Sequence, residues 1–170
     1  SDLRVFKNTV KYNDFLDFRK NAEGLKTVKP ETLEVHKIYK ELIDIIKNEN
    51  NNGLMREIAV DLILFFKAEG HKIIGLENEL INLLTSNTSG WYIKKILISR
   101  LPDSISSDDK INYDKLKAAI VNIINRKPTS IDLTNHLMNL KLSSIEVLSQ
   151  LGVNYSLVKS TIESEIKDSK

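Results

Sequence analysis

The sequence predicts an all-α protein. Apolar residues recur along it at the spacing of one helix face, as in the set formed by Ile38, Leu42, Ile45 and Ile46. Only 6 Gly and 3 Pro interrupt 170 residues, and no segment sustains the alternation of a strand. Hydrophobic residues make up 41% and charged residues 28%, so a domain with an ordinary core is expected.

The first 50 residues are predicted to form an N-terminal helical extension whose role the sequence does not indicate. Its early apolar residues fit one or two short helices as well as extended chain: Phe6, Val10, Phe15 and Phe18. A clearer helix follows Pro30, which suits a first helical turn because its missing N–H would have no partner there. Residues 48–53 are expected to end this helix, because they contain a polar run and a glycine.

The middle of the chain predicts three helices and a linker. Residues 54–69 are apolar nearly all round, so this helix should be central. It ends at Gly70, and shorter helices are expected at 75–84 and 89–101, the second closed by Pro102. Residues 102–110 are polar and acidic and form the predicted linker.

The last third predicts four more helices. The first covers 113–124, and two short ones follow near 132–141 and 143–151, with Ser143-x-x-Glu146 as a capping box. Gly152 ends this series and Asn154 can cap the last helix. The buried stripe of that helix would consist of Leu157, Val158, Ile162 and Ile166.

An internal repeat organises these helices. Residues 74–83 (Ile-Gly-Leu-Glu-Asn-Glu-Leu-Ile-Asn-Leu) align with 131–140 (Ile-Asp-Leu-Thr-Asn-His-Leu-Met-Asn-Leu), and a longer apolar helix precedes each copy. We therefore expect repeat one at 54–101, the linker at 102–110 and repeat two at 111–168, within one domain over 51–170. Two pseudo-symmetric repeats packed as one bundle would leave a groove between them.

The same segment resembles a known family. Residues 70–84 read Gly-His-Lys-Ile-Ile-Gly-Leu-Glu-Asn-Glu-Leu-Ile-Asn-Leu-Leu, and 147–154 read Val-Leu-Ser-Gln-Leu-Gly-Val-Asn. Both are similar to the repeat signature of the amino-terminal domain of Clp-type AAA+ unfoldases, over about residues 54–167. In the family a Thr-Glu-His motif stands where this chain has Leu76-Glu77-Asn78 and Leu133-Thr134-Asn135.

The resemblance implies a docking domain that binds a protein substrate or adaptor, with AAA+ rings in the same polypeptide as a further partner. The alternative is a stand-alone helical adaptor or scaffold with no linked motor. The chain has no Gly-x-x-x-x-Gly-Lys-[Ser/Thr] loop, so it should not bind ATP in that manner by itself. An enzyme of unrecognised type is a third hypothesis, and it would need clustered acidic or histidine residues in a pocket.

Five residues are candidate partner-binding positions. In relatives that recognise phosphorylated arginine, a Glu of the motif contacts the ligand in each repeat; here Glu77 matches and Thr134 stands at the second position. Glu77 also suits the first turn of a helix, where its charge complements the helix dipole. Trp91 and Tyr92 are either interface anchors or core residues, and His136 either faces a partner or lies on the surface.

Composition narrows the function classes. The net charge is only +2 and the basic residues are scattered, so no nucleic-acid or membrane partner is expected. There is no cysteine, and His36, His71 and His136 lack the spacing of a helical metal pair. We therefore expect no metal, no cofactor and no catalytic residue, in a cytoplasmic protein.

Overall fold

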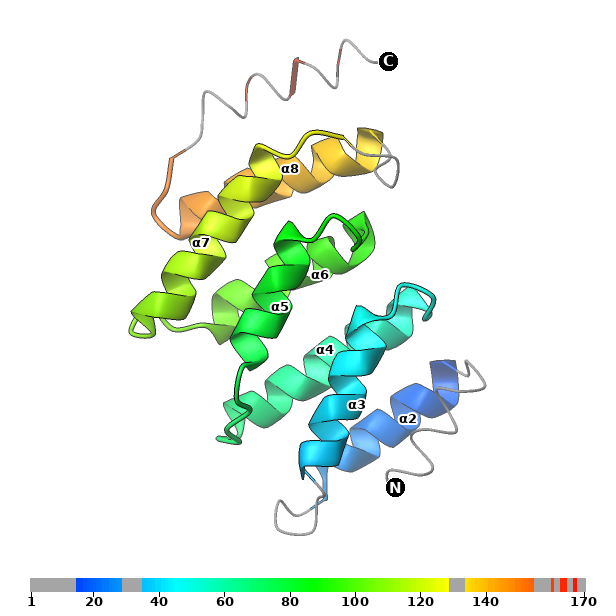
Figure 1. Cartoon of the computed structure of the whole chain (residues 1–170). Coiled ribbons are helices and arrows are strands. Elements are labelled where there is room, and N and C mark those ends of the chain that lie inside the picture. Colours follow the sequence, from blue (N-terminus) through cyan, green and yellow to red (C-terminus); the bar gives the residue numbers. More distant parts are fainter. Residues whose placement is uncertain are drawn as a thin grey trace. The chain divides into compact units, whose positions relative to one another are not determined.

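The fold of the chain is all-helical, as predicted. The computed structural model describes residues 15–28, 35–128 and 134–154, together with positions 160, 163–164 and 167. These parts contain seven helices and no strand (Figure 1). None of the helices described is long and apolar enough to cross a membrane. Pro30 and the stripe expected on the last helix lie outside the described residues.

The helices group into two compact units, Ser1–Ile74 and Gly75–Lys170. We refer to them as the N-terminal and C-terminal units. This division does not coincide with the expected boundary after residue 50, because the helix that should open repeat one packs on helices that precede it in the sequence. The expected first repeat therefore contributes residues to both units.

The N-terminal unit contains α2 (Phe15–Lys26), α3 (Val35–Lys47) and α4 (Gly53–Ala68). Residues 48–52 join α3 and α4 into a helical hairpin, and α2 packs on α4. Asn52 caps α4 by accepting a hydrogen bond from the N–H of Leu54 at 2.8 Å. The most deeply buried apolar side chains come from all three helices: Phe18, Leu25, Leu42, Ile46, Met55, Leu62 and Ile63.

A buried arginine closes the α3–α4 hairpin. Arg56 is 3% exposed, and its Nε donates to the carbonyl oxygen of Ile46 at 2.8 Å. The two terminal nitrogens of its guanidinium contact the Glu49 carboxylate at 3.0 and 3.2 Å. Planar guanidinium and carboxylate groups match in this bidentate geometry, which fixes the connection as well as neutralising the charge.

Aromatic rings pack together at the end of the α3–α4 hairpin opposite its connecting loop. Tyr39 of α3 packs against Phe66 of α4, with ring centroids 5.8 Å apart. His71, just beyond Gly70, packs edge-on against both rings. The Tyr39 hydroxyl is buried with no hydrogen-bond partner among the described residues. Burial raises the pKa of Tyr39 to about 12, because the charged phenolate would lose its hydration.

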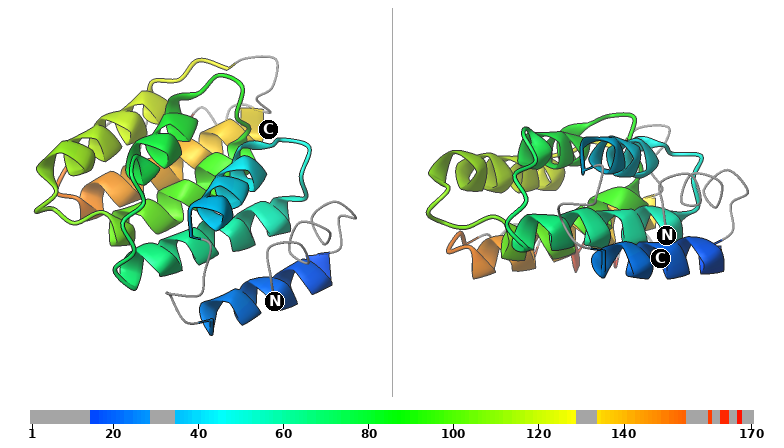
Figure 2. Two further views of the ribbon diagram at one scale, coloured as in Figure 1. Left: turned by 60° about the horizontal axis from the view of Figure 1, so that its bottom comes forward. Right: turned by 90° about the horizontal axis from the view of Figure 1, so that it is seen from below.

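The C-terminal unit contains α5 (Leu76–Thr85), α6 (Trp91–Ser104), α7 (Lys110–Ile124) and α8 (Thr134–Gln150). Residues 86–90 join α5 to α6, and α7 packs on α8. The two helical pairs stack, with α5 against α7 and α6 against α8. Figure 2 shows α5 and α7 in one layer of this unit and α6 and α8 in the other.

The linker expected at 102–110 was predicted too long, because α6 and α7 extend into its two ends. Pro102 lies inside α6, which continues to Ser104, and α7 begins at Lys110. A proline so near a helix end removes only one backbone donor, and the N–H of Ile105 still reaches the carbonyl oxygen of Leu101 at 3.0 Å. The connection is therefore 105–109, and Asp109 caps α7.

The two short helices expected at 132–141 and 143–151 form one helix, α8. Ser143 is therefore not a cap, because it lies in the middle of that helix. The aligned decamers fall on α5, which a separate helix follows, and on α8, which simply continues. The described residues therefore do not show the predicted pseudo-symmetric repeat, since the similar decamers belong to helices of different length and neighbourhood.

Candidate functional site

Three of the predicted partner-binding residues form one aromatic cluster in the C-terminal unit. The rings of Trp91 and His136 stack face to face, with centroids 4.0 Å apart and planes inclined by 5°. Tyr92 packs edge-on against Trp91 at 5.6 Å. All three side chains are partly exposed. The cluster therefore forms a partly exposed aromatic surface whose rings pack against one another.

The cluster lies where two helices begin. Trp91 and Tyr92 open α6, and His136 is in the first turn of α8. Because α6 and α8 pack side by side and their first turns touch through the Trp91–His136 stack, the two helices run in the same direction. Gly90 precedes α6 in an extended conformation and has no side chain to cap it.

The ends of α5 and α7 meet at this same place. Arg126, just after α7, donates from one guanidinium nitrogen to the side-chain oxygen of Asn87, just after α5, at 3.1 Å. This region, where α5 and α7 end and α6 and α8 begin, is called the hairpin-loop end below. The residues just after α5 and just after α7 are thus in contact through the Arg126–Asn87 hydrogen bond.

A buried lysine anchors the loop that presents Trp91. Lys94 is 1% exposed, and its ammonium group donates to the carbonyl oxygens of Ser86 and Ser89 at 2.7 and 2.8 Å. It also donates to the Ser89 hydroxyl oxygen at 2.7 Å. That hydroxyl in turn donates to the carbonyl oxygen of Leu83 in α5. The loop 86–90 is thus tied both to the helix before it and to the helix after it.

Sequence reasoning missed Lys94, although a signal was present. Lys94 shares one face of α6 with three buried apolar residues, since positions 94, 97, 98 and 101 follow helical spacing. A lone cation on an apolar face must either reach solvent or find acceptors inside. The serines of the preceding loop, 86 and 89, are those acceptors, so a buried anchor could have been expected here.

Glu77 does not join the cluster. It stands in the first turn of α5, which ends at Thr85, so roughly 12 Å of helix separates it from the hairpin-loop end. Gly75 precedes α5 with φ of 78° and offers no side-chain cap. A carboxylate in the first turn therefore complements the unsatisfied N–H groups there. Thr134 begins α8, but its side chain lies outside the described residues.

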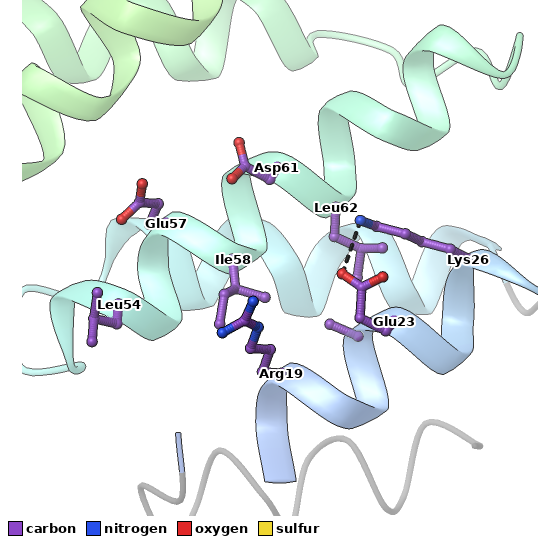
Figure 3. Close-up of a pocket in the computed structure, with 9 residues that line it drawn as sticks. Arg19, Glu23, Lys26, Leu54, Glu57, Ile58, Asp61 and Leu62 are labelled. Carbon is purple, nitrogen blue, oxygen red and sulfur yellow. Dashed lines mark hydrogen bonds and ion pairs between the residues drawn. The ribbon is translucent and has the colours of Figure 1, made fainter. Parts of the chain in front are cut away.

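A pocket lies between α2 and α4 in the N-terminal unit (Figure 3). Its volume is about 310 Å³. Charged groups of both signs line it: Arg19, Glu23, Lys26, Glu57 and Asp61. Lys26 is engaged by Glu23 at 3.1 Å and lies over the Phe65 ring. With its charges nearly balanced, the pocket does not select for a ligand of one sign.

The described residues hold no group of three or more His, Asp or Glu side chains that could bind a metal ion. His36 is exposed on α3, and His71 and His136 each pack against aromatic rings. Each of the three histidines is thus either exposed to solvent or packed against an aromatic ring.

No family model, curated protein or solved structure matches the chain. The aromatic cluster and the side chains that hold it are therefore the features from which a function can be argued.

Proposed function

We propose that the chain is a protein-docking module that acts by binding alone, through the cluster of Trp91, Tyr92 and His136. The observation that carries this proposal is the face-to-face stack of Trp91 on His136 in a partly exposed position. Trp and Tyr are the residues that most often dominate the binding energy of protein interfaces.

The surroundings of the cluster support a docking role. A side chain that is already held in place loses less conformational entropy when a partner binds. Trp91 is held by its stack on His136 and by a loop that Lys94 anchors with three hydrogen bonds. The surface is thus prepared before the partner arrives, and truncating Trp91 should cost about 2 kcal/mol or more of binding energy.

The narrower form of this proposal is a substrate- or adaptor-docking domain of a Clp-like unfoldase, with AAA+ rings in the same polypeptide. It is supported by the sequence motif at residues 70–84 and 147–154. The glycines of that motif at positions 70, 75 and 152 have φ between 78° and 96°, which favours glycine at each turn. In this form Glu77 provides a polar contact for the partner.

A second form, a stand-alone helical adaptor, is favoured by the helix order. The decamer at 131–140 runs into the single helix α8, and the C-terminal unit is built of stacked helical pairs. Stacked pairs of helices are the building principle of helical scaffolds that bind partners along an extended surface.

Affinity capture from a lysate of the source organism distinguishes these forms. The wild-type chain is compared with Trp91→Ala and with Glu77→Ala, after circular dichroism has shown that both variants are folded. Partners lost only with Trp91→Ala support docking at the aromatic cluster. Partners lost with Glu77→Ala support the Clp-like form, and an ATPase domain encoded in the same gene would support it independently. Retention of every partner by both variants would refute the proposal.

A further inference from the structure

We infer that the hairpin-loop end of the C-terminal unit docks an acidic segment of a partner protein. This inference rests on the docking function proposed above and specifies the chemistry of the partner: carboxylates together with at least one apolar side chain. It comes from the distribution of charge around the cluster of Trp91, Tyr92 and His136.

The C-terminal unit carries its charges asymmetrically. Residues 80–102, 115–128 and 134–145 contain no Asp or Glu. They include the described residues of the hairpin-loop end and the parts of the helices that lead to it. The carboxylates between residues 75 and 128 lie instead toward the opposite end, at the start of α5, the end of α6, the 105–109 connection and the start of α7: Glu77, Glu79, Asp103, Asp108, Asp109 and Asp114.

Cations accompany the aromatic cluster. Lys95 lies one turn after Trp91 on α6, and Lys127 follows the end of α7; both are exposed. Lys94 and Arg126 are buried and donate to oxygens of the 86–90 loop. The starts of α6 and α8 add the partial positive charge of two helix dipoles. Asp132 stands in the sequence between α7 and α8 and lies outside the described residues.

This combination matches an acidic protein segment better than a nucleic acid. A nucleic-acid site usually neutralises six or more phosphates with a basic stripe, whereas the whole chain has a net charge of only +2. Two exposed lysines at the same end of the unit as three aromatic rings suit a short segment in which two carboxylates flank an apolar residue. The rings would supply the affinity, and the lysines the preference for charge.

The test uses a fluorescein-labelled peptide of Glu, Asp and Leu residues and a matched peptide in which Lys replaces every acidic residue. Binding is followed by fluorescence anisotropy. We expect the acidic peptide to bind and the basic one not to bind. The double variant Lys95→Glu/Lys127→Glu should weaken binding about tenfold, and Trp91→Ala should weaken it at least as much. Raising the salt concentration from about 0.05 M to about 0.5 M should also weaken it.

The double variant Lys110→Glu/Lys115→Glu is the matched control, because it changes the net charge by the same amount and both lysines are exposed but lie toward the other end of α7. An equal loss with this control would mean that net charge alone drives binding, and it would overturn the inference. So would the absence of acidic-peptide binding, or tighter binding of a DNA duplex or of vesicles containing phosphatidylserine.

The affinity capture separates the two levels of the proposal. Partners that depend on Trp91 but are retained by Lys95→Glu/Lys127→Glu would overturn the acidic-segment inference and leave the docking function standing. If no captured partner depends on Trp91, both the docking function and the inference fail.

Discussion

Replacing Lys94 with methionine should destabilise the C-terminal unit by about 2–4 kcal/mol. The substitution keeps most of the side-chain volume but removes the three hydrogen bonds that the ammonium group makes with Ser86 and Ser89. Each carbonyl left without a donor in a buried site costs about 1–3 kcal/mol. Relief from burying a charge offsets part of this loss, and for that reason the expected value is below the sum of the three bonds.

Urea unfolding followed by tryptophan fluorescence measures this effect. Trp91 is the only tryptophan of the chain, so its emission reports on the C-terminal unit alone. Lys95→Met is the control, because Lys95 is exposed and its replacement should change the free energy of unfolding by about 0.5 kcal/mol or less. If Lys94→Met proved as stable as Lys95→Met, the buried ammonium would not anchor the 86–90 loop, and the account of how Trp91 is held would be wrong.

Three further predictions concern stability elsewhere in the chain. Tyr39→Phe should stabilise the N-terminal unit by about 1 kcal/mol, because it removes a buried hydroxyl that has no partner among the described residues. The pKa of Tyr39 is about 12 in the folded state against its usual 10.0, so the folded protein binds this proton more tightly than the unfolded chain. The contribution of this proton to the free energy of unfolding is complete below pH 10 and should be lost between pH 10 and 12, a fall of about 2–3 kcal/mol. Equilibrium unfolding of Tyr39→Phe at several pH values should not show that fall. Arg56→Met should lower the free energy of unfolding in urea by about 2–3 kcal/mol, because it leaves the Ile46 carbonyl without its donor. Glu49→Gln should lower it by about 1 kcal/mol or less, since Glu49 is 42% exposed. Equal losses for the two variants would contradict this difference in burial. Gly75→Ala should lower the melting temperature through about 1–2 kcal/mol of backbone strain at φ of 78°, since nothing within 4 Å opposes the added methyl group; an unchanged melting temperature would show that the turn relaxes.

The sequence was most informative where helix signals were local. Apolar spacing located α4, α5 and α7 to within a few residues, because each apolar segment ends at a glycine or a polar turn. It failed at Pro102 and near residue 142, because the stop signals at those positions are weak. Proline near the end of α6 removes a single donor, and serines at 143 and 144 fit inside α8, where the Ser144 hydroxyl donates to the carbonyl oxygen of Leu140.

The candidate site was predicted in part. Trp91, Tyr92 and His136 were each singled out, but their meeting could not be foreseen, because it depends on α6 and α8 starting at the same end. Glu77 was also predicted to bind a partner, through a family motif, and it lies at the end of α5 that is far from the hairpin-loop end. Glu77 and Trp91 are near each other in the sequence but not in space, since α5 lies between Glu77 and the loop that precedes Trp91.

Photo-crosslinking at Tyr92 tests the docking proposal most directly. The substitution Tyr92→p-benzoylphenylalanine places a photoreactive group inside the aromatic cluster. Tyr113→p-benzoylphenylalanine is the matched control, because Tyr113 is also a partly exposed tyrosine but lies near the start of α7, away from the hairpin-loop end. Docking through the aromatic cluster predicts discrete covalent protein adducts at position 92 that disappear when Trp91→Ala is added, and none of these adducts at position 113. The absence of adducts at position 92, or the same adducts at both positions, would contradict it.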